Sequence, residues 1–158
     1  MKANKTNVMR VLEQHQIEYS AYNFGDGVTA ASGTEVAEIL GKDPLTVFKT
    51  LVTVGKSEKN YVFVVPCCFE LDLKKAAEAV GEKNIEMIKS KELLPLTGYI
   101  HGGCSPIGMK KLFPTVVDIS AREYDRILFS GGRIGCQVEV APADLEKVIP
   151  VKYADIIE

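Results

Sequence analysis

The sequence contains no tryptophan, only two histidines, and four cysteines without a CxxC pair. Because structural zinc sites are built from closely spaced cysteines and histidines, we expect no metal and no other cofactor. No apolar run approaches the roughly 20 residues of a membrane-spanning helix, and the segment after Met1 lacks the apolar block of a signal peptide. These absences favour a cytoplasmic protein, in which disulfides are not expected.

The chain also carries little net charge. Its 19 lysines and arginines stand against 21 aspartates and glutamates, which gives −2 at pH 7. A global field that attracts nucleic acid is therefore absent, and an RNA contact would need a local basic patch such as Lys110, Lys111 and Arg133. With 158 residues, 46% hydrophobic and 25% charged, the composition predicts one globular domain over residues 1–158.

Helices are predicted from apolar residues at helical spacing and from capping residues. Ser32 and Glu35 form one capping box, and Ser120 and Glu123 form another. Gly41 fits the left-handed conformation that often ends a helix. Helices are expected over residues 4–16, between Ser32 and Gly41, between Asp72 and Gly81, from Ser90 to about Leu94, and from Pro142 onward.

Runs of β-branched and aromatic residues predict the strands. They cover residues 17–24, 47–54, 61–65, 85–88, 99–100, 115–119, 127–130 and 136–140. Strands and helices follow one another irregularly, with hairpin-like and crossover connections mixed. This order predicts an α+β fold, in which helices surround a mixed, bent sheet.

The most unusual stretch is the glycine-rich loop of residues 102–108. It contains Gly102, Gly103, Cys104, Ser105 and Pro106 in succession. Glycine permits positive φ and close backbone approach, and proline stiffens the turn. Such a loop can point several backbone N–H groups at a carbonyl oxygen, a carboxylate or a phosphate. A tight turn between two strands is the alternative, because glycine-rich loops occur wherever a chain reverses.

Lys49 is a single charge inside an apolar strand, with Val47 and Leu51 on its own predicted face. A lysine held in a cleft favours a bound anion or carbonyl oxygen. The alternative is a lysine whose stem covers apolar surface while its ammonium group reaches water.

A second glycine-rich turn, residues 130–133, combines the hydroxyl of Ser130 with the guanidinium of Arg133. An ordinary hairpin turn is the alternative interpretation. Cys104 is a candidate nucleophile with His101 as its base, but no third group that would orient the histidine is evident.

Four segments in this order resemble the YbaK/EbsC family of free-standing aminoacyl-tRNA editing proteins and the similar editing domain of bacterial prolyl-tRNA synthetases. They are residues 48–52, 71–75, 102–111 and 130–133, and the likeness extends to residues 152–156. The resemblance implies a strongly bent, barrel-like sheet. It also implies a cytoplasmic hydrolase that removes a wrong amino acid from tRNA(Pro), which in the YbaK branch is cysteine.

The resemblance further implies the site residues. The family lysine, taken as catalytic, falls on Lys49. The substrate-binding positions fall on Tyr22, Thr50, Gly102, Gly103, Cys104, Ser105, Pro106, Ser130, Gly131 and Gly132. In the family, the thiol of the cysteinyl group attacks its own ester carbonyl and leaves as a thiolactone, which suits a chain without a recognisable triad.

Two positions depart from the family pattern, and they concern amino-acid preference. A phenylalanine of the best-known members falls on Ser32, and an aspartate falls on Gln137. The alternatives are therefore an Ala-tRNA(Pro) deacylase that uses water and a non-catalytic module that binds tRNA or a synthetase. The expected partner is the acceptor end of mischarged tRNA(Pro), with prolyl-tRNA synthetase as a second candidate and neither DNA nor a membrane.

Overall fold

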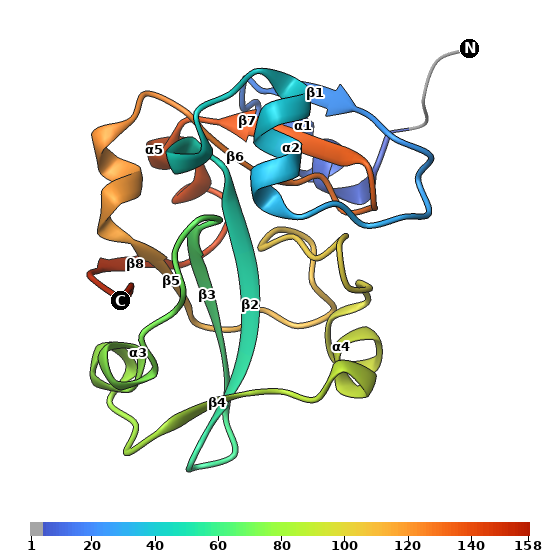
Figure 1. The fold of residues 1–158 in the computed structure, drawn as a ribbon. Helices are drawn as coiled ribbons and strands as arrows, with labels where there is room; N and C mark the ends of the chain where they lie inside the picture. The colour runs from blue at the N-terminus through green and yellow to red at the C-terminus, as the bar shows by residue number, and fades with distance from the viewer. Residues whose placement is uncertain (1–4) are drawn as a thin grey trace.

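The computed structural model describes residues 5–158, whose strands form two sheets (Figure 1). One sheet has the strand order β1-β7-β6 and is antiparallel. The other has the order β4-β2-β3-β5-β8 and mixes parallel with antiparallel pairs. A single bridge between Val47 and Leu128 connects them. The α+β prediction is confirmed, but the expected single bent sheet is two sheets, and neither is closed into a barrel within the described residues.

The bounds of the elements are as follows. The strands are β1 (Ser20–Asn23), β2 (Phe48–Gly55), β3 (Asn60–Pro66), β4 (Ile85–Met87), β5 (Thr115–Asp118), β6 (Ile127–Ser130), β7 (Cys136–Val140) and β8 (Val151–Ala154). The helices are α1 (Asn7–Gln14), α2 (Gly33–Leu40), α3 (Leu73–Val80), α4 (Ser90–Thr97) and α5 (Pro142–Leu145), with 3-10 turns η1 (Pro44–Thr46) and η2 (Ile119–Glu123). None of the helices in this part of the chain is long and apolar enough to cross a membrane.

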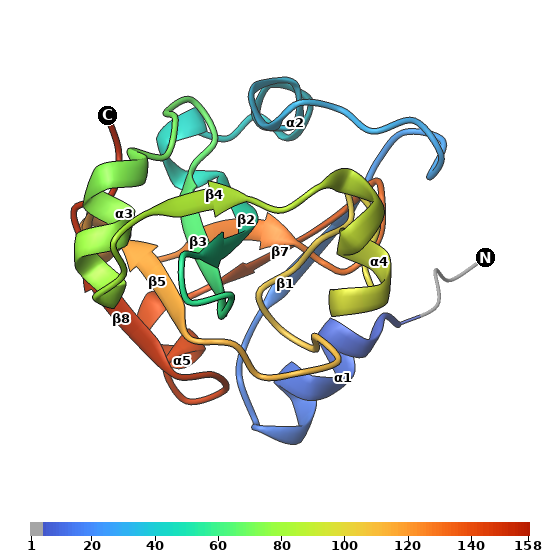
Figure 2. The ribbon, with the colours of Figure 1, turned by 90° about the horizontal axis from the view of Figure 1, so that it is seen from below.

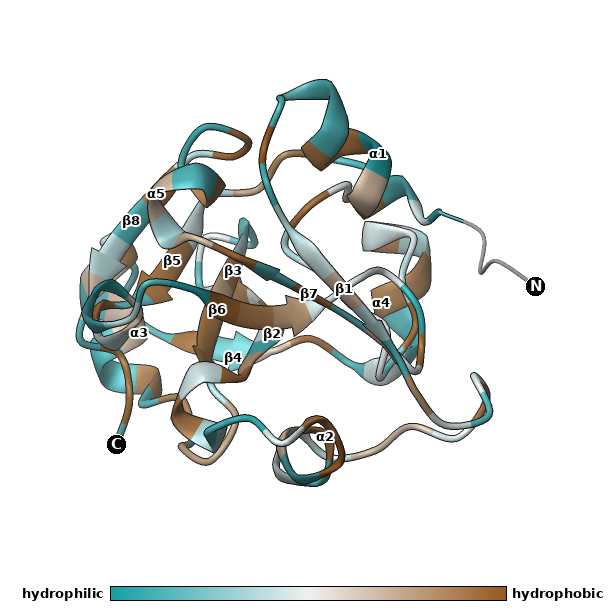
Figure 3. Ribbon diagram, turned by 90° about the horizontal axis from the view of Figure 1, so that it is seen from above, coloured by the Kyte–Doolittle hydropathy of each residue, from teal (hydrophilic) through white to brown (hydrophobic). Residues whose placement is uncertain are grey.

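The three-stranded sheet has two faces with different neighbours. Phe129 of β6 and Val138 of β7 lie on the face that joins the large core, together with Phe48 and Val52 of β2. Leu128 lies on the opposite face and packs against α2. Figure 3 shows β6 as an apolar strand. The face toward α2 is the one that carries the polar residues of the site.

The five-stranded sheet leaves part of one edge of β2 open. β2 pairs with β3 along its whole length, but β4 pairs with β2 only over Thr53–Gly55. The bridge at Val47 occupies the other end of this edge. Between them, residues 48–52 have no strand partner on this side among the described residues. Figure 2 shows α3 and α4 near the two ends of β4.

Most local predictions are confirmed. Thr6 caps α1, whereas Asn4, the other candidate cap, lies outside the described residues. The box of Ser32 and Glu35 caps α2, and Gly41 takes the left-handed conformation. Asp72 caps α3, and Gly81 ends it. β3 is buried on both faces, as its apolar run predicts.

Other local predictions are wrong. Residues 99–100 form no strand, because Tyr99 turns inward and its hydroxyl donates to the Ile107 carbonyl. Ser90 is the first residue of α4 rather than its cap, and α4 continues through Pro95. The proposed Ser120/Glu123 box is a 3-10 turn whose cap is Asp118. β8, which pairs in parallel with β5, was not predicted as a strand.

Candidate active site

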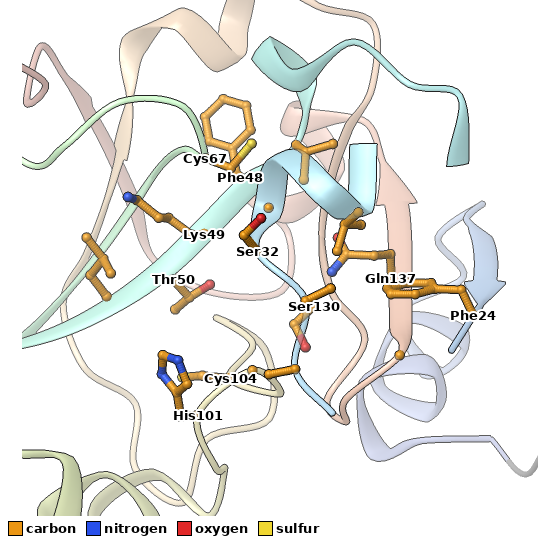
Figure 4. Close-up of a pocket in the computed structure, with 18 of the residues that line it drawn as sticks. Phe24, Ser32, Phe48, Lys49, Thr50, Cys67, His101, Cys104, Ser130 and Gln137 are labelled. Carbon is orange, nitrogen blue, oxygen red and sulfur yellow. The ribbon is translucent and has the colours of Figure 1, made fainter. Parts of the chain in front are cut away.

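A cavity of about 350 Å³ lies where the open edge of β2 faces the ends of β6 and β7. The start of α2 and the loop at His101 complete its wall (Figure 4). It is lined by Phe24, Ala30, Ala31, Ser32, Gly33, Val36, Val47, Phe48, Lys49, Thr50, Leu51, Cys67, Leu93, His101, Gly102, Cys104, Ser130, Gly135 and Gln137. Four segments that are distant in the sequence therefore meet at one hollow.

Lys49 and Thr50 line this cavity although they lie on opposite faces of β2. Val47 and the first four residues of β2, 48–51, all contribute to the wall, because the cavity faces the edge of β2 rather than one face. The ammonium group of Lys49 lies 3.5 Å from Oε1 of Glu70, and about 30% of the lysine side chain is exposed. Lys49 thus places a positive charge at the rim, where its carboxylate partner is itself mostly exposed.

Ser130 and Gln137 reach the cavity from the three-stranded sheet. They are paired across β6 and β7, and paired residues project on the same face of a sheet. The Ser130 hydroxyl accepts a hydrogen bond of 3.1 Å from the Gly132 N–H, which fixes the glycine-rich turn. Figure 4 shows Ser130 and Gln137 on the side of the cavity opposite Thr50.

Two buried oxygen atoms in this wall lack a hydrogen-bond partner among the described residues: Oγ1 of Thr50 and Oε1 of Gln137. Leaving such an atom without a partner costs about 1–3 kcal/mol. Native proteins tolerate few of these atoms, and a bound group often completes them. A bound group that donates hydrogen bonds would satisfy both atoms.

The two glycine-rich loops pack against their neighbours where no side chain fits. Gly102 has φ +87°, and a Cβ there would lie 2.7 Å from Cβ of Ala30. A Cβ on Gly103 would lie 3.0 Å from Cα of Arg133 in the second loop. The glycines let the loops approach one another and bring residue 102 to the cavity.

Several residues predicted to bind substrate do not line the cavity. Tyr22 is paired with Gln137, but its hydroxyl donates to Glu139 at 2.9 Å. Ser105 is buried, and its hydroxyl accepts from the Ile107 N–H. Pro106 lines a smaller cavity of about 160 Å³. Gly103, Gly131 and Gly132 shape the loops from behind the wall, and the Gly103 N–H donates to the Ile100 carbonyl.

Cys104 lines the cavity, but its environment does not suit a nucleophile. Burial raises the pKa of its thiol to about 12, so the thiol stays protonated near neutral pH. The thiolate is the reactive form of cysteine. Burial also raises the pKa of the other thiol in the wall, that of Cys67, to about 11. The structure thus offers no activated protein thiol at the cavity.

Sequence reasoning singled out Ser32 at the start of α2 but missed its neighbours Ala30, Ala31 and Gly33 in the wall. Residues 30–33 line the cavity, and the turn before them is held by the Asp26 carboxylate, which accepts from the N–H groups of Val28 and Thr29. Glycines flank Asp26 in the sequence, but nothing local shows that Ala30 after this turn approaches Gly102. The proposed basic pair Lys110–Lys111 does not line the cavity.

The family model of the aminoacyl-tRNA editing domain matches residues 28–148 of this chain. Over 152 residues the chain is 47% identical to "Putative Cys-tRNA(Pro)/Cys-tRNA(Cys) deacylase EbsC" of Enterococcus faecalis, with 96% of this chain and 93% of that protein covered. It is 23% identical over 141 residues to the uncharacterised protein YwhH of Bacillus subtilis, with 86% and 89% covered.

A crystal structure described as "a putative trans-editing enzyme for prolyl tRNA synthetase" has the same fold. The TM-score is 0.81 at 25% identity, with 98% of this chain and 99% of that chain covered. This likeness over nearly the full length of both chains shows that the overall fold is shared.

Proposed function

Because this chain belongs to the aminoacyl-tRNA editing domain family and is an aminoacyl-tRNA deacylase, we propose that it hydrolyses mischarged Cys-tRNA(Pro) in the cavity between the two sheets. The observation that carries this assignment is the meeting of Lys49, Thr50, Gly102 and Ser130 at one hollow of about 350 Å³. That volume accepts a small aminoacyl group together with part of the terminal ribose, while the rest of the tRNA stays outside.

The chemistry rests on the thiol of the substrate. Its sulfur attacks the ester carbonyl carbon, so that a C–S bond forms and the C–O bond to the terminal ribose breaks. The thiol proton passes to the departing ribose oxygen, and the cysteinyl group leaves as a four-membered thiolactone that water then opens. Holding a nucleophile beside its carbonyl can supply about 7–11 kcal/mol through orientation alone.

The protein supplies position and charge in this scheme. The Lys49 ammonium group lines the cavity and can stabilise the carbonyl oxygen as negative charge develops, and the hydroxyls of Thr50 and Ser130 offer further contacts to the substrate. The Gly103 N–H already donates to the Ile100 carbonyl, so we do not assign it to the oxyanion. The protonated Cys104 leaves the attack to the thiol of the substrate.

A deacylation panel tests the proposal. Cys-, Ala- and Ser-tRNA(Pro) are incubated with the protein, and the released product is identified at the first turnover. We expect Cys-tRNA to react much faster and the thiolactone to precede free cysteine. Faster release of alanine, or free cysteine that carries oxygen from labelled water with no trappable thiolactone, would show that water is the nucleophile.

We also propose that residues 1–158 act as one editing domain in the cytoplasm, with the acceptor end of tRNA(Pro) at the cavity and prolyl-tRNA synthetase as a second partner. The net charge of −2 supports help from a partner, because it gives the protein little long-range attraction for RNA. Co-migration of this protein with the synthetase, with and without tRNA(Pro), tests the association.

A further inference from the structure

The two unpartnered oxygens of the cavity come from different sheets. Thr50 belongs to β2 of the five-stranded sheet and Gln137 to β7 of the three-stranded sheet. Their side chains project into the cavity from opposite sides (Figure 4). The amide oxygen of Gln137 can only accept, and the hydroxyl of Thr50 can accept as well as donate, so a group with N–H or O–H donors satisfies both atoms. Two acceptors on facing walls suit a group with more than one donor.

The charges of the wall limit what that group can be. Lys49 supplies the positive charge of the wall, and no aspartate or glutamate occurs among the described residues that line the cavity. A cation bound here is therefore recognised by neutral oxygens and lies away from Lys49. A carbonyl oxygen lies toward Lys49. One end of the cavity therefore offers hydrogen-bond acceptors, and the other end carries a positive charge.

An aminoacyl ester carries both complementary groups on adjacent atoms. Its α-ammonium group has three N–H donors, and its ester carbonyl is an acceptor. We propose that Thr50 and Gln137 form a subsite for the α-ammonium group, and that this subsite sets which way the aminoacyl group enters. The inference rests on the proposed function, and it makes Gln137 a residue that selects for the amine.

The orientation has a consequence for the attack. The α-ammonium group is held between Thr50 and Gln137, and the carbonyl oxygen is directed to Lys49. These two contacts fix the orientation of the bond between the α-carbon and the carbonyl carbon. Rotation about the bond between Cα and Cβ then remains for the thiol to reach the carbonyl carbon. Losing the ammonium contacts should therefore lower kcat as well as raise KM.

A pair of substrates isolates this contact. One is Cys-tRNA(Pro), and the other is its analogue in which a hydroxyl replaces the α-ammonium group, so that thiol and ester are unchanged. We expect the unmodified protein to prefer the amine in kcat/KM by about tenfold or more, as hydrogen bonds to a charged group typically allow. Gln137→Met keeps the length of the side chain but removes the acceptor, and it should reduce this preference severalfold by slowing Cys-tRNA only.

Two further variants provide matched controls. Thr50→Val removes the second acceptor with little change in shape and should also reduce the preference, whereas Thr50→Ser should retain it. Gln137→Glu keeps the acceptor, adds a charge and should increase it. The unfolding transition of each variant is measured as well, so that a poorly folded variant is recognised. The folded variants then show whether the preference for the amine depends on Thr50 and Gln137.

The outcomes separate the subsite from the proposed function. If the unmodified protein does not deacylate Cys-tRNA(Pro), the proposed function is wrong, and the subsite falls with it. If it deacylates Cys-tRNA(Pro) but folded Gln137→Met and Thr50→Val slow both substrates equally, the two side chains only shape the wall. In that case the α-ammonium subsite alone is overturned.

Discussion

Ser130 and Gln137 lie directly opposite each other in the ladder between β6 and β7, and the side chains of both enter the same cavity. They are seven positions apart along the chain, on either side of the turn at Gly131–Gly135. The hydroxyl of Ser130 holds that turn through the Gly132 N–H. The hairpin therefore fixes both the shape of the second glycine-rich loop and the placement of two polar groups in the site.

Lys49→Met should abolish most deacylation while the protein stays folded. The substitution keeps the aliphatic stem but removes the positive charge, and losing one donor to a developing oxyanion typically costs about 10²–10³ in rate. The measurement is kcat/KM for Cys-tRNA(Pro) together with the melting temperature.

Glu70→Gln is the matched control for Lys49. The Glu70 side chain is about 79% exposed, and ion pairs at such sites contribute little to stability. We expect activity close to that of the unmodified protein. Equal losses in both variants would mean that the ion pair, and not the lysine charge itself, is what the site needs.

Gly102→Ala should destabilise the protein more than Gly27→Ala does. Both glycines have positive φ, +87° and +76°, so each alanine carries about 1–2 kcal/mol of left-handed strain. Only at Gly102 would the new Cβ collide, at 2.7 Å from Ala30 Cβ, whereas nothing lies within 4 Å of it at Gly27. Urea unfolding measures the difference, and equal losses would contradict the close packing of the loop.

Cys104→Ala should retain substantial deacylase activity, and so should Cys136→Ala. The buried Cys104 thiol is protonated near neutral pH because burial raises its pKa to about 12, so its removal takes away no nucleophile. Cys136 is buried behind the wall and does not line the cavity. Complete loss of turnover in a folded Cys104→Ala protein would instead indicate that Cys104 is the nucleophile.

The same thiol should make stability depend on pH above about 9. The folded protein binds the Cys104 proton up to about pH 12, whereas the unfolded chain releases it near the ordinary value of about 9. Since the folded-state pKa is the higher one, the free energy of unfolding falls as pH rises through this window, by up to about 1.4 kcal/mol per pH unit for one group. The free energy of unfolding of Cys104→Ala, measured by urea titration, should fall less steeply between pH 9 and 11 than that of the unmodified protein. Parallel dependences on pH in the two proteins would contradict the raised pKa.

Local features of this protein follow from the sequence alone. The capping box of Ser32 and Glu35, the glycine stops at Gly41 and Gly81, and the hairpin of β6 and β7 each depend on residues within a few positions of one another. Capping and turn formation are short-range interactions, so a short window of sequence contains their cause. The motif resemblance also identified Lys49, Thr50, Gly102, Cys104 and Ser130, all of which line the cavity.

The shape of the site was decided only by tertiary structure. Alternation along β2 placed Lys49 and Thr50 on opposite faces, and nothing local shows that both border the open edge of that strand. That edge is open because β4 ends its pairing at Thr53 and Leu128 meets Val47 from the other sheet. For the same reason the sequence did not exclude Tyr22, whose hydroxyl bonds to Glu139 instead of entering the cavity. Such outcomes depend on contacts between residues 30 to more than 100 positions apart, because the positions where sheets separate are set by the packing of the whole chain.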